Sequence, residues 1–193
     1  MWGYNVIWDV KILHMKFLKH TLCVQKNTCN DMVYGDLGVC PLEVEIKVRI
    51  VKYWVRLITG KPGKLAYIMY QCLLYLDTVG LYTSPWLNEV RSVLNNCGMS
   101  GVWLCWEVPN PVWLGKAIQQ RLKDQWITQW YGNIVTKSIC SNYVSFKNVF
   151  GREDYLLKLQ TKARFTLVKL RTNNNRLPIT VGRYQNIPRG KDI

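Results

Sequence analysis

The residues with the widest chemistry in this sequence are its histidines and cysteines, and their spacing decides what they can do. The two histidines are His14 and His20. A cysteine or serine nucleophile needs a base within hydrogen-bond reach. On one helix, residues six apart point about 120° away from each other, so we expect no catalytic triad. His20, Cys23, Cys29 and Cys40 form an H-x2-C-x5-C-x10-C string. Structural zinc sites use two close pairs and this string has one, so we expect free thiols, no bound metal and no cofactor.

A third possible site combines Glu45-Ile46-Lys47 with Asp31 or Asp36 upstream. Restriction-type nucleases hold a divalent metal and activate water with an Asp followed by an acid-x-Lys motif, whose carboxylates converge from strand edges. This arrangement requires residues 42–50 to form a strand. It leaves one alternative function open, a metal-dependent nuclease centred on Asp36, Glu45 and Lys47.

Residues 42–58 can be interpreted in two ways. Residues 42–50 alternate between apolar and charged side chains, which is typical of a half-buried strand. A helix is favoured because Pro41 suits a helix start and because the pattern continues for about 17 residues, longer than an average strand. Two acid–base pairs also have the i,i+4 spacing of a helix: Glu43 with Lys47, and Glu45 with Arg49. We therefore predict a helix.

The remaining elements also follow helical patterns. Ser84, Pro85 and Gly98 delimit a helix, and residues 111–136 form a long helix with apolar residues every fourth position. Residues 99–111 are an irregular connector. Shorter helices are expected after Thr28, over 152–159 and over 162–172. A first helix would bury a stripe consisting of Val6, Val10, Leu13, Phe17 and Val24.

The most apolar run, residues 65–82, contains Gln71 and Asp77. An acidic residue in the middle of a membrane span is costly, so this run predicts a buried core helix and no membrane association. The fold class expected is mostly α, an irregular multi-helix bundle with an extended basic C-terminal strip. Its domains are an N-terminal helical bundle (1–109), a long helix plus basic helices (110–170) and the strip (171–193), possible parts of one continuous domain.

The charge of the chain is large and uneven. The formal net charge is +14 over 193 residues. Residues 1–100 hold 11 Lys+Arg against 7 Asp+Glu, a net +4, and residues 101–193 hold 15 against 5, a net +10. Such a field attracts polyanions. Seven cysteines without a CxxC, and a start without a cleavable signal, predict an intracellular protein of the nucleus or cytoplasm.

The basic residues gather near the C-terminus, in the helix at 162–172 and in the strip "RTNNNRLPITVGRYQNIPRG". Arginine binds phosphates through a planar fork, and a tyrosine can stack on a base. The two residue pairs Lys162/Lys169 and Arg164/Arg171 would form two basic ridges on the helix. The candidate nucleic-acid-binding residues are Lys162, Arg164, Lys169, Arg171, Arg176, Arg183, Tyr184 and Arg189.

Several stretches carry a family resemblance, above all "RTNNNRLPITVGRYQNIPR", together with "SPWLNEVRSVLNNCGMSGVW" and "KAIQQRLKDQWITQWY". In order and register they resemble the region downstream of the polymerase domain in non-LTR (LINE-type) retrotransposon polyproteins, which combine an endonuclease with a reverse transcriptase (an RNA-directed DNA polymerase). Asn175 stands where the family usually has His, and Thr180 where it usually has Glu. The resemblance implies a C-terminal fragment that ends before the family's zinc-knuckle-like segment and lacks the polymerase aspartates.

The sequence therefore predicts a non-catalytic fragment that binds RNA template or target DNA, takes no small-molecule substrate and has the upstream polymerase domain as a possible partner. Besides the nuclease, a second alternative is an inert or protein-binding helical module that docks through exposed Trp103, Trp106 and Trp113.

Overall fold

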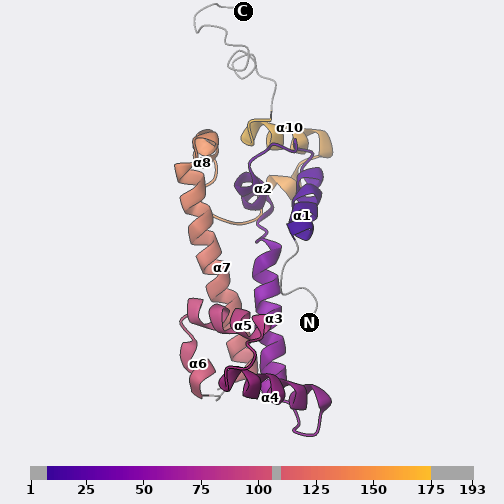
Figure 1. Cartoon of the computed structure of the whole chain (residues 1–193). Coiled ribbons are helices and arrows are strands. Elements are labelled where there is room, and N and C mark those ends of the chain that lie inside the picture. The colour runs from indigo at the N-terminus through magenta and orange to yellow at the C-terminus, as the bar shows by residue number, and fades with distance from the viewer. Residues whose placement is uncertain (1–7, 106–109, 175–193) are drawn as a thin grey trace, which may run out of the picture. The chain divides into compact units, whose positions relative to one another are not determined.

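The computed structural model describes residues 8–105 and 110–174, which are mostly helical (Figure 1). Within these ranges no strand forms, and an isolated antiparallel bridge joins Leu37 to Arg152. The predicted mostly α, multi-helix fold is confirmed, and all but the first residues of the predicted C-terminal strip lie outside the described ranges. The elements are α1 (Trp8–Thr21), α2 (Asn30–Leu37), α3 (Leu42–Ile58), α4 (Leu65–Thr78), α5 (Pro85–Asn96), α6 (Ser100–Cys105), α7 (Pro111–Thr136), a 3-10 helix η1 (Ser138–Cys140), α8 (Ser141–Val144), α9 (Tyr155–Lys158) and α10 (Thr161–Arg171).

The helices belong to two compact units, and neither unit is continuous in sequence. Unit 1 consists of Met1–Ile12 and Cys40–Thr128, and unit 2 of Leu13–Val39 and Gln129–Ile193. The long helices α1 and α7 each contribute residues to both units.

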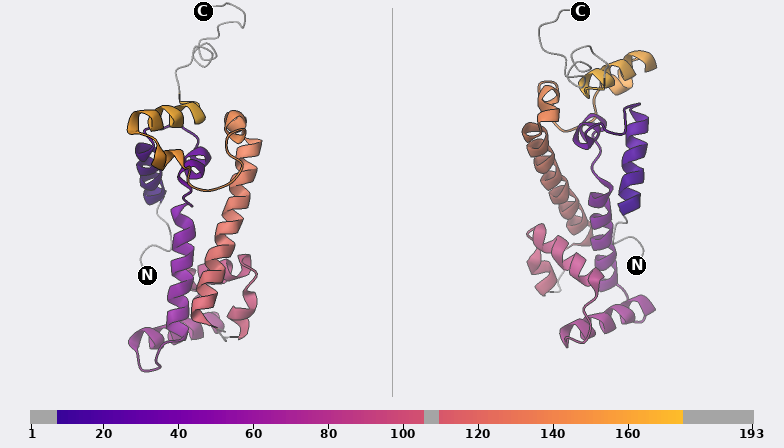
Figure 2. Two further views of the ribbon diagram at one scale, coloured as in Figure 1. Left: turned by 180° about the vertical axis from the view of Figure 1, so that it is seen from behind. Right: turned by 45° about the horizontal axis from the view of Figure 1, so that its top comes forward.

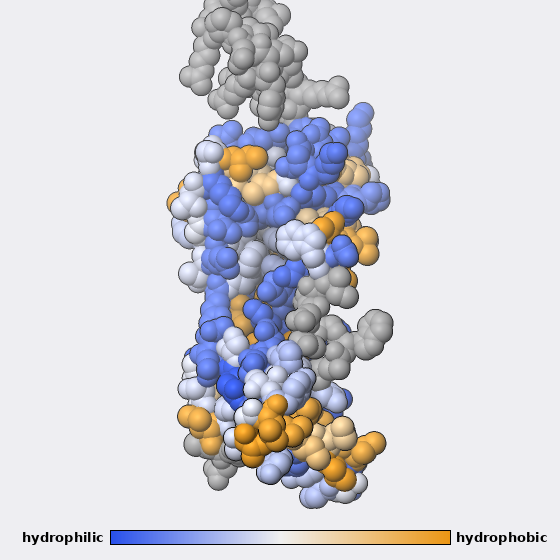
Figure 3. All heavy atoms as spheres, viewed as in Figure 1, coloured by the Kyte–Doolittle hydropathy of each residue, from blue (hydrophilic) through white to orange (hydrophobic). Residues whose placement is uncertain are grey.

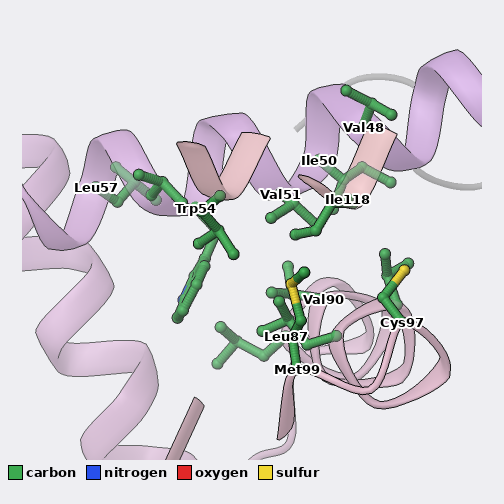
Figure 4. Close-up of a cluster of buried hydrophobic side chains, with 14 of the residues drawn as sticks. Val48, Ile50, Val51, Trp54, Leu57, Leu87, Val90, Cys97, Met99 and Ile118 are labelled. Carbon is green, nitrogen blue, oxygen red and sulfur yellow. The ribbon is translucent and has the colours of Figure 1, made fainter. Parts of the chain in front are cut away.

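The core of unit 1 forms between α3, α5 and the first part of α7, and α3 and α7 run side by side in both views of Figure 2. Residues 42–58 are helical, so the helix prediction is confirmed and the strand alternative is wrong. Figure 4 shows Val51 and Trp54 of α3 facing Leu87 and Val90 of α5. Each large apolar side chain buried in this way stabilises the unit by about 1.5–3 kcal/mol.

Helix α5 begins and ends where its sequence signals predict. Pro85 is its first residue, Ser84 occupies the N-cap position, and Gly98 follows the end with φ +66°. The Ser84 side chain makes no capping hydrogen bond, so the helix starts there without the bond that the sequence suggests.

Two expectations about unit 1 are wrong. Residues 65–78 are helical, but α4 buries Tyr70 and Leu74 and leaves most of its other apolar side chains exposed. The run is apolar on all sides while unit 1 covers one side only, so hydropathy alone overstated its burial. Residues 100–105 of the predicted connector form α6, which packs Trp103 against the core.

Unit 2 has a smaller core, formed by residues that are distant in sequence. Its buried members are Met15, Leu18 and Leu22 near the end of α1, Val33 of α2, Leu156 of α9 and Val168 of α10. The apolar stripe predicted for α1 is wrong, because Leu13 and Phe17 are exposed. The neighbouring face of α1, which carries Met15 and Leu18, is buried instead.

The predicted α2 and α7 helices are confirmed, with one change at the start of α2. The N-cap of α2 is Cys29 and not Thr28, whose hydroxyl instead contacts Asn174. Gly38 ends α2 in the left-handed conformation that glycine adopts most readily, at φ +62°. Helix α7 spans 111–136 as predicted, and its buried residues lie mostly four apart: Leu114, Ile118, Leu122, Trp130 and Ile134.

Candidate nucleic-acid interface

Helix α10 carries the predicted basic residues that lie within the described chain. Its Val168 is fully buried in the unit 2 core, which fixes the side of the helix that faces inward. Lys162 and Lys169 lie on a different side of the helix and are exposed. Lysine carries a compact charge on a flexible stem and contacts phosphates as a point charge. This pair forms the predicted ridge.

The second predicted ridge, Arg164 with Arg171, does not form. The Arg164 guanidinium is half-buried: it donates a hydrogen bond to the Leu156 carbonyl at 3.0 Å and lies 5.2 Å from the centre of the Phe165 ring. Arg171 is buried and faces the interior of unit 2. The sequence placed both arginines on one side of the helix, but that side faces the protein.

Arg171 joins a buried network centred on Asp36, whose side chain has no exposed surface. Asp36 accepts hydrogen bonds from Tyr143 at 2.8 Å, from Tyr155 at 2.6 Å and from Arg171 at 3.3 Å. Buried charges require such partners, because an unpaired carboxylate loses its hydration without compensation. Glu153 gives Arg171 a second carboxylate at 3.3 Å.

Lys147 completes this network. Its ammonium group pairs with Glu153 and donates to the Gly151 carbonyl at 2.6 Å, and its side chain is almost fully buried. Burial lowers the pKa of Arg171, but the carboxylates of Asp36 and Glu153 outweigh that effect and raise it, so the guanidinium stays charged. Burial, followed by the charge of Asp36, raises the pKa of both Tyr143 and Tyr155. The charges of the network pair with one another, and of its buried polar atoms the Nε of Arg171 has no hydrogen-bond partner among the described residues. These pairs hold α2, α8, α9 and α10 together.

A second polar cluster lies around Asp31 at the start of α2. Asp31 accepts a hydrogen bond from Asn133 at 3.2 Å and pairs with Lys137, while its backbone carbonyl accepts from the Trp130 indole at 2.8 Å. The hydrogen bond from Lys137 to Asp31 is the main cause of the raised pKa of that lysine. The end of α7 is thereby attached to α2.

Basic residues far outnumber acidic residues in unit 2. Unit 2 holds 15 Lys+Arg against 5 Asp+Glu, a net +10, and unit 1 holds 11 against 7, a net +4. In the described part of unit 2 there are 11 basic and 4 acidic residues, a net +7. All four acids are in ion pairs, with Lys137, Lys147, Lys158 and Arg171.

Seven basic side chains of unit 2 consequently make no ion pair with any described residue: Lys16, Lys19, Lys26, Arg152, Lys162, Arg164 and Lys169. Four of these residues lie in α1, in the loop after it, or at the bridge to Leu37. Sequence reasoning did not include them because they are far from the C-terminal strip. The fold adds the missing information, because it places residues 13–39 in the same unit as the basic C-terminal part of the chain.

The other predicted interface residues, Arg176, Arg183, Tyr184 and Arg189, lie outside the described residues. Asn174, the last described residue of the strip, is held by hydrogen bonds. The Asn174 amide donates to the Thr28 hydroxyl at 2.7 Å and to the Thr172 hydroxyl at 2.8 Å. Asn174 therefore lies beside the start of α2.

The residues of the alternative nuclease site do not have the arrangement that a nuclease needs. The strand-edge geometry that the nuclease hypothesis requires is lacking, because Glu45 and Lys47 lie on helix α3 and the Asp36 carboxylate is occupied by two tyrosines and Arg171. Over residues 8–105 and 110–174, His, Cys, Asp and Glu side chains form no group of three able to hold a metal. In the same residues, no helix combines the length and the apolar character needed to cross a bilayer.

The predicted tryptophan docking surface is also changed. Trp103 stacks on Trp54 with ring centres 5.5 Å apart and lies beneath the Arg91 guanidinium, so it belongs to the core. Trp113 is exposed, and Trp106 lies outside the described residues. The predicted exposure of Trp103 is therefore wrong.

Comparison with known proteins identifies no relative. No family model matches the sequence, and neither a curated protein nor a solved structure matches it.

Proposed function

We propose that unit 2 binds RNA or DNA without catalysing a reaction, through the unpaired basic side chains on and around α10. The observation that supports this most is that every described carboxylate of unit 2 is already in an ion pair, while seven basic side chains are not. A phosphate backbone supplies the missing negative charge and releases counterions on binding.

The resemblance to the post-polymerase region of LINE-type elements supports the same function. In that setting the fragment helps to seat template RNA or target DNA beside the upstream polymerase domain, in the nucleus or cytoplasm. The strip with Arg176, Arg183, Tyr184 and Arg189 would extend the contact from the point where Asn174 is anchored.

A salt titration with a matched pair of variants tests the proposal. The double variant Lys162→Gln/Lys169→Gln removes two exposed charges, seven residues apart, from α10 of unit 2. Lys116→Gln/Lys123→Gln removes two exposed charges with the same spacing from the part of α7 that belongs to unit 1. Glutamine and lysine have similar helix propensity, so neither variant should unfold its helix.

The expected result is a loss of affinity for the α10 variant alone. Its plot of log binding constant against log salt should flatten by roughly 1.5, the counterion release of two phosphate contacts. Titrations of single-stranded RNA, single-stranded DNA and duplex DNA show which is preferred. If the two variants lose affinity and slope equally, binding is a general effect of net charge and the proposed interface is wrong.

A further inference from the structure

Helix α4 exposes an apolar stripe that no described residue of unit 1 covers. Tyr70 and Leu74 face the core, while the stripe lies on the opposite side. It consists of Leu65, Ile68, Met69, Cys72, Tyr75 and Val79, all exposed, and Leu81 and Tyr82 follow it. A helix that is apolar on all sides is normally buried on all sides. One side of α4 is therefore incomplete in the single chain.

The stripe carries no charge of its own. The one acidic residue of α4, Asp77, is nearly buried and pairs with Arg91 at 2.6 Å, so it belongs to the inner side. Figure 3 shows apolar residues gathered over the α4 end of unit 1, whereas unit 2 is mostly polar in this view. A partner for the stripe needs apolar surface and no complementary charge.

The size of the patch fits a stable protein interface. Leu65, Tyr75 and Leu81 are 74%, 65% and 75% exposed. Summed over the patch, the exposed side chains present roughly 800 Å², which is what each partner contributes to an interface of standard size. Apolar patches on monomers are commonly smaller, at about 300–600 Å².

The order of residues along the stripe suggests which partner covers it. Cys72 is its midpoint, seven residues from Leu65 and seven from Val79. If two copies of α4 pack antiparallel about a two-fold axis at Cys72, Leu65 faces Val79 of the other copy and Met69 faces Tyr75. Leu65 then meets the smaller Val79, and the Met69 thioether meets the Tyr75 ring, a favourable contact. An isologous two-fold contact is the commonest form of homodimer.

We propose that two copies of this chain form a homodimer through the α4 stripe, packed antiparallel with the two Cys72 thiols at the axis. The proposal does not depend on nucleic-acid binding. The interface is apolar, so added salt should leave the dimer intact while it weakens electrostatic binding of a nucleic acid.

Sedimentation equilibrium of the full chain and cross-linking with a short bis-maleimide test the proposal together. We expect a dimer at moderate salt that cross-links through Cys72. Cys72→Ser should abolish the cross-link and keep the dimer, and Cys23→Ser, which removes the other exposed thiol among the described cysteine side chains, should leave the cross-link unchanged. Cys140 will not compete, because it is buried and because burial and the Cys29 thiol raise its pKa to about 12.

A polar substitution at the stripe provides an independent readout. Met69→Gln/Tyr75→Gln should raise the dissociation constant of the dimer roughly 10- to 100-fold, the effect of losing central interface anchors. Both side chains are exposed in the single chain, so the circular dichroism spectrum should not change. A monomer at every concentration overturns the proposal and leaves the stripe to another protein or a lipid surface. A dimer that ignores this substitution, or that cross-links through Cys23, overturns it as well.

Discussion

Asp36 is the residue on which the polar interior of unit 2 depends. Its carboxylate is fully buried and is held by two tyrosine hydroxyls and one guanidinium. Removing one partner from a buried ion pair leaves the other charge without compensation, which is more damaging than replacing both. The contribution of Arg171 to stability can therefore be measured only by comparing its loss alone with its loss together with the Asp36 charge.

Replacing Arg171 by methionine should lower the free energy of unfolding by about 3 kcal/mol, because Asp36 keeps its tyrosines but loses its cation. Urea unfolding of the full chain, followed by circular dichroism, measures the change. Lys169→Met is the matched control on the exposed side of the same helix and should stay within about 0.5 kcal/mol of the parent chain. Adding Asp36→Asn to the Arg171 variant should restore part of the loss. Equal effects of the two methionine variants would contradict a buried ion pair at Arg171.

The two tyrosines make the stability of the fold depend on pH in the alkaline range. An unfolded tyrosine loses its proton near pH 10.0, whereas in the folded chain burial and Asp36 raise the pKa of Tyr143 and Tyr155 well above that value. Above pH 10 the folded state thus binds more protons than the unfolded state, and stability falls as pH rises, by up to about 1.4 kcal/mol per pH unit for each tyrosine.

Urea unfolding at several pH values between about 9 and 11.5 measures this slope, over the range in which free tyrosine ionises. Tyr143→Phe should reduce the decline above pH 10, since it removes one of the two protons that the fold retains. Lysines also titrate in this range, but they are the same in both proteins and cancel in the comparison. If the phenylalanine variant shows the same slope as the parent chain, Tyr143 loses its proton in the folded state.

At the scale of the element, Gly35 sets how closely α2 approaches its neighbours. A Cβ at this position would lie 2.5 Å from the Tyr143 hydroxyl and 2.8 Å from the Trp130 ring. Both side chains are fully buried and cannot retreat. Glycine is otherwise unfavourable inside a helix by about 1 kcal/mol relative to alanine, so packing is the reason why α2 has one here.

Gly35→Ala should therefore destabilise unit 2 by roughly 1–3 kcal/mol, the usual effect of overpacking, despite the better helix propensity of alanine. Gly132→Ala, on α7 with open space around its Cβ position, should stabilise the helix by up to about 1 kcal/mol. Thermal unfolding of the two variants gives the comparison. A gain in stability at both positions would mean that α2 does not pack closely against Trp130 and Tyr143.

The helices were predictable from sequence, whereas the faces they bury were less so. Proline, glycine and i,i+4 signals act within a few residues and located α3, α5 and α7. Which side of α1 or α10 faces inward depends on partners more than 100 residues away, such as Asp36 for Arg171. A basic residue near the C-terminus and an acidic one in α2 give no local sign that they will pair. The exposed side of α4 was hidden for another reason: the helix is apolar on all sides, so hydropathy does not show which side faces α3 and α5.

At the scale of the whole molecule, the charge is divided unevenly between the two units. Unit 2 carries net +10 and unit 1 net +4. The ion pairs of unit 2 are largely buried, so salt screens them little, while the unpaired cations around α10 are mostly exposed and repel one another. We expect this repulsion to destabilise the free protein and to be relieved by anions that gather at its surface.

Raising sodium chloride from about 0.01 M to about 0.3 M shortens the Debye length from about 30 Å to below 10 Å. We expect the thermal midpoint to rise by roughly 2–4 °C, the effect of about 1 kcal/mol on a chain of this size. The rise should shrink in Lys162→Gln/Lys169→Gln and persist in Lys116→Gln/Lys123→Gln. A midpoint that falls with salt would mean that the ion pairs outweigh the repulsion.

An oligonucleotide should produce the same stabilisation at a far lower concentration than salt, because a ligand that binds only the folded state stabilises it by mass action. Its effect should be largest at low salt and should fade as sodium chloride is added, since the oligonucleotide and chloride neutralise the same basic side chains. Calorimetry at fixed oligonucleotide and increasing salt follows both contributions. A stabilisation by oligonucleotide that does not depend on salt would show that its contacts are not with these basic side chains.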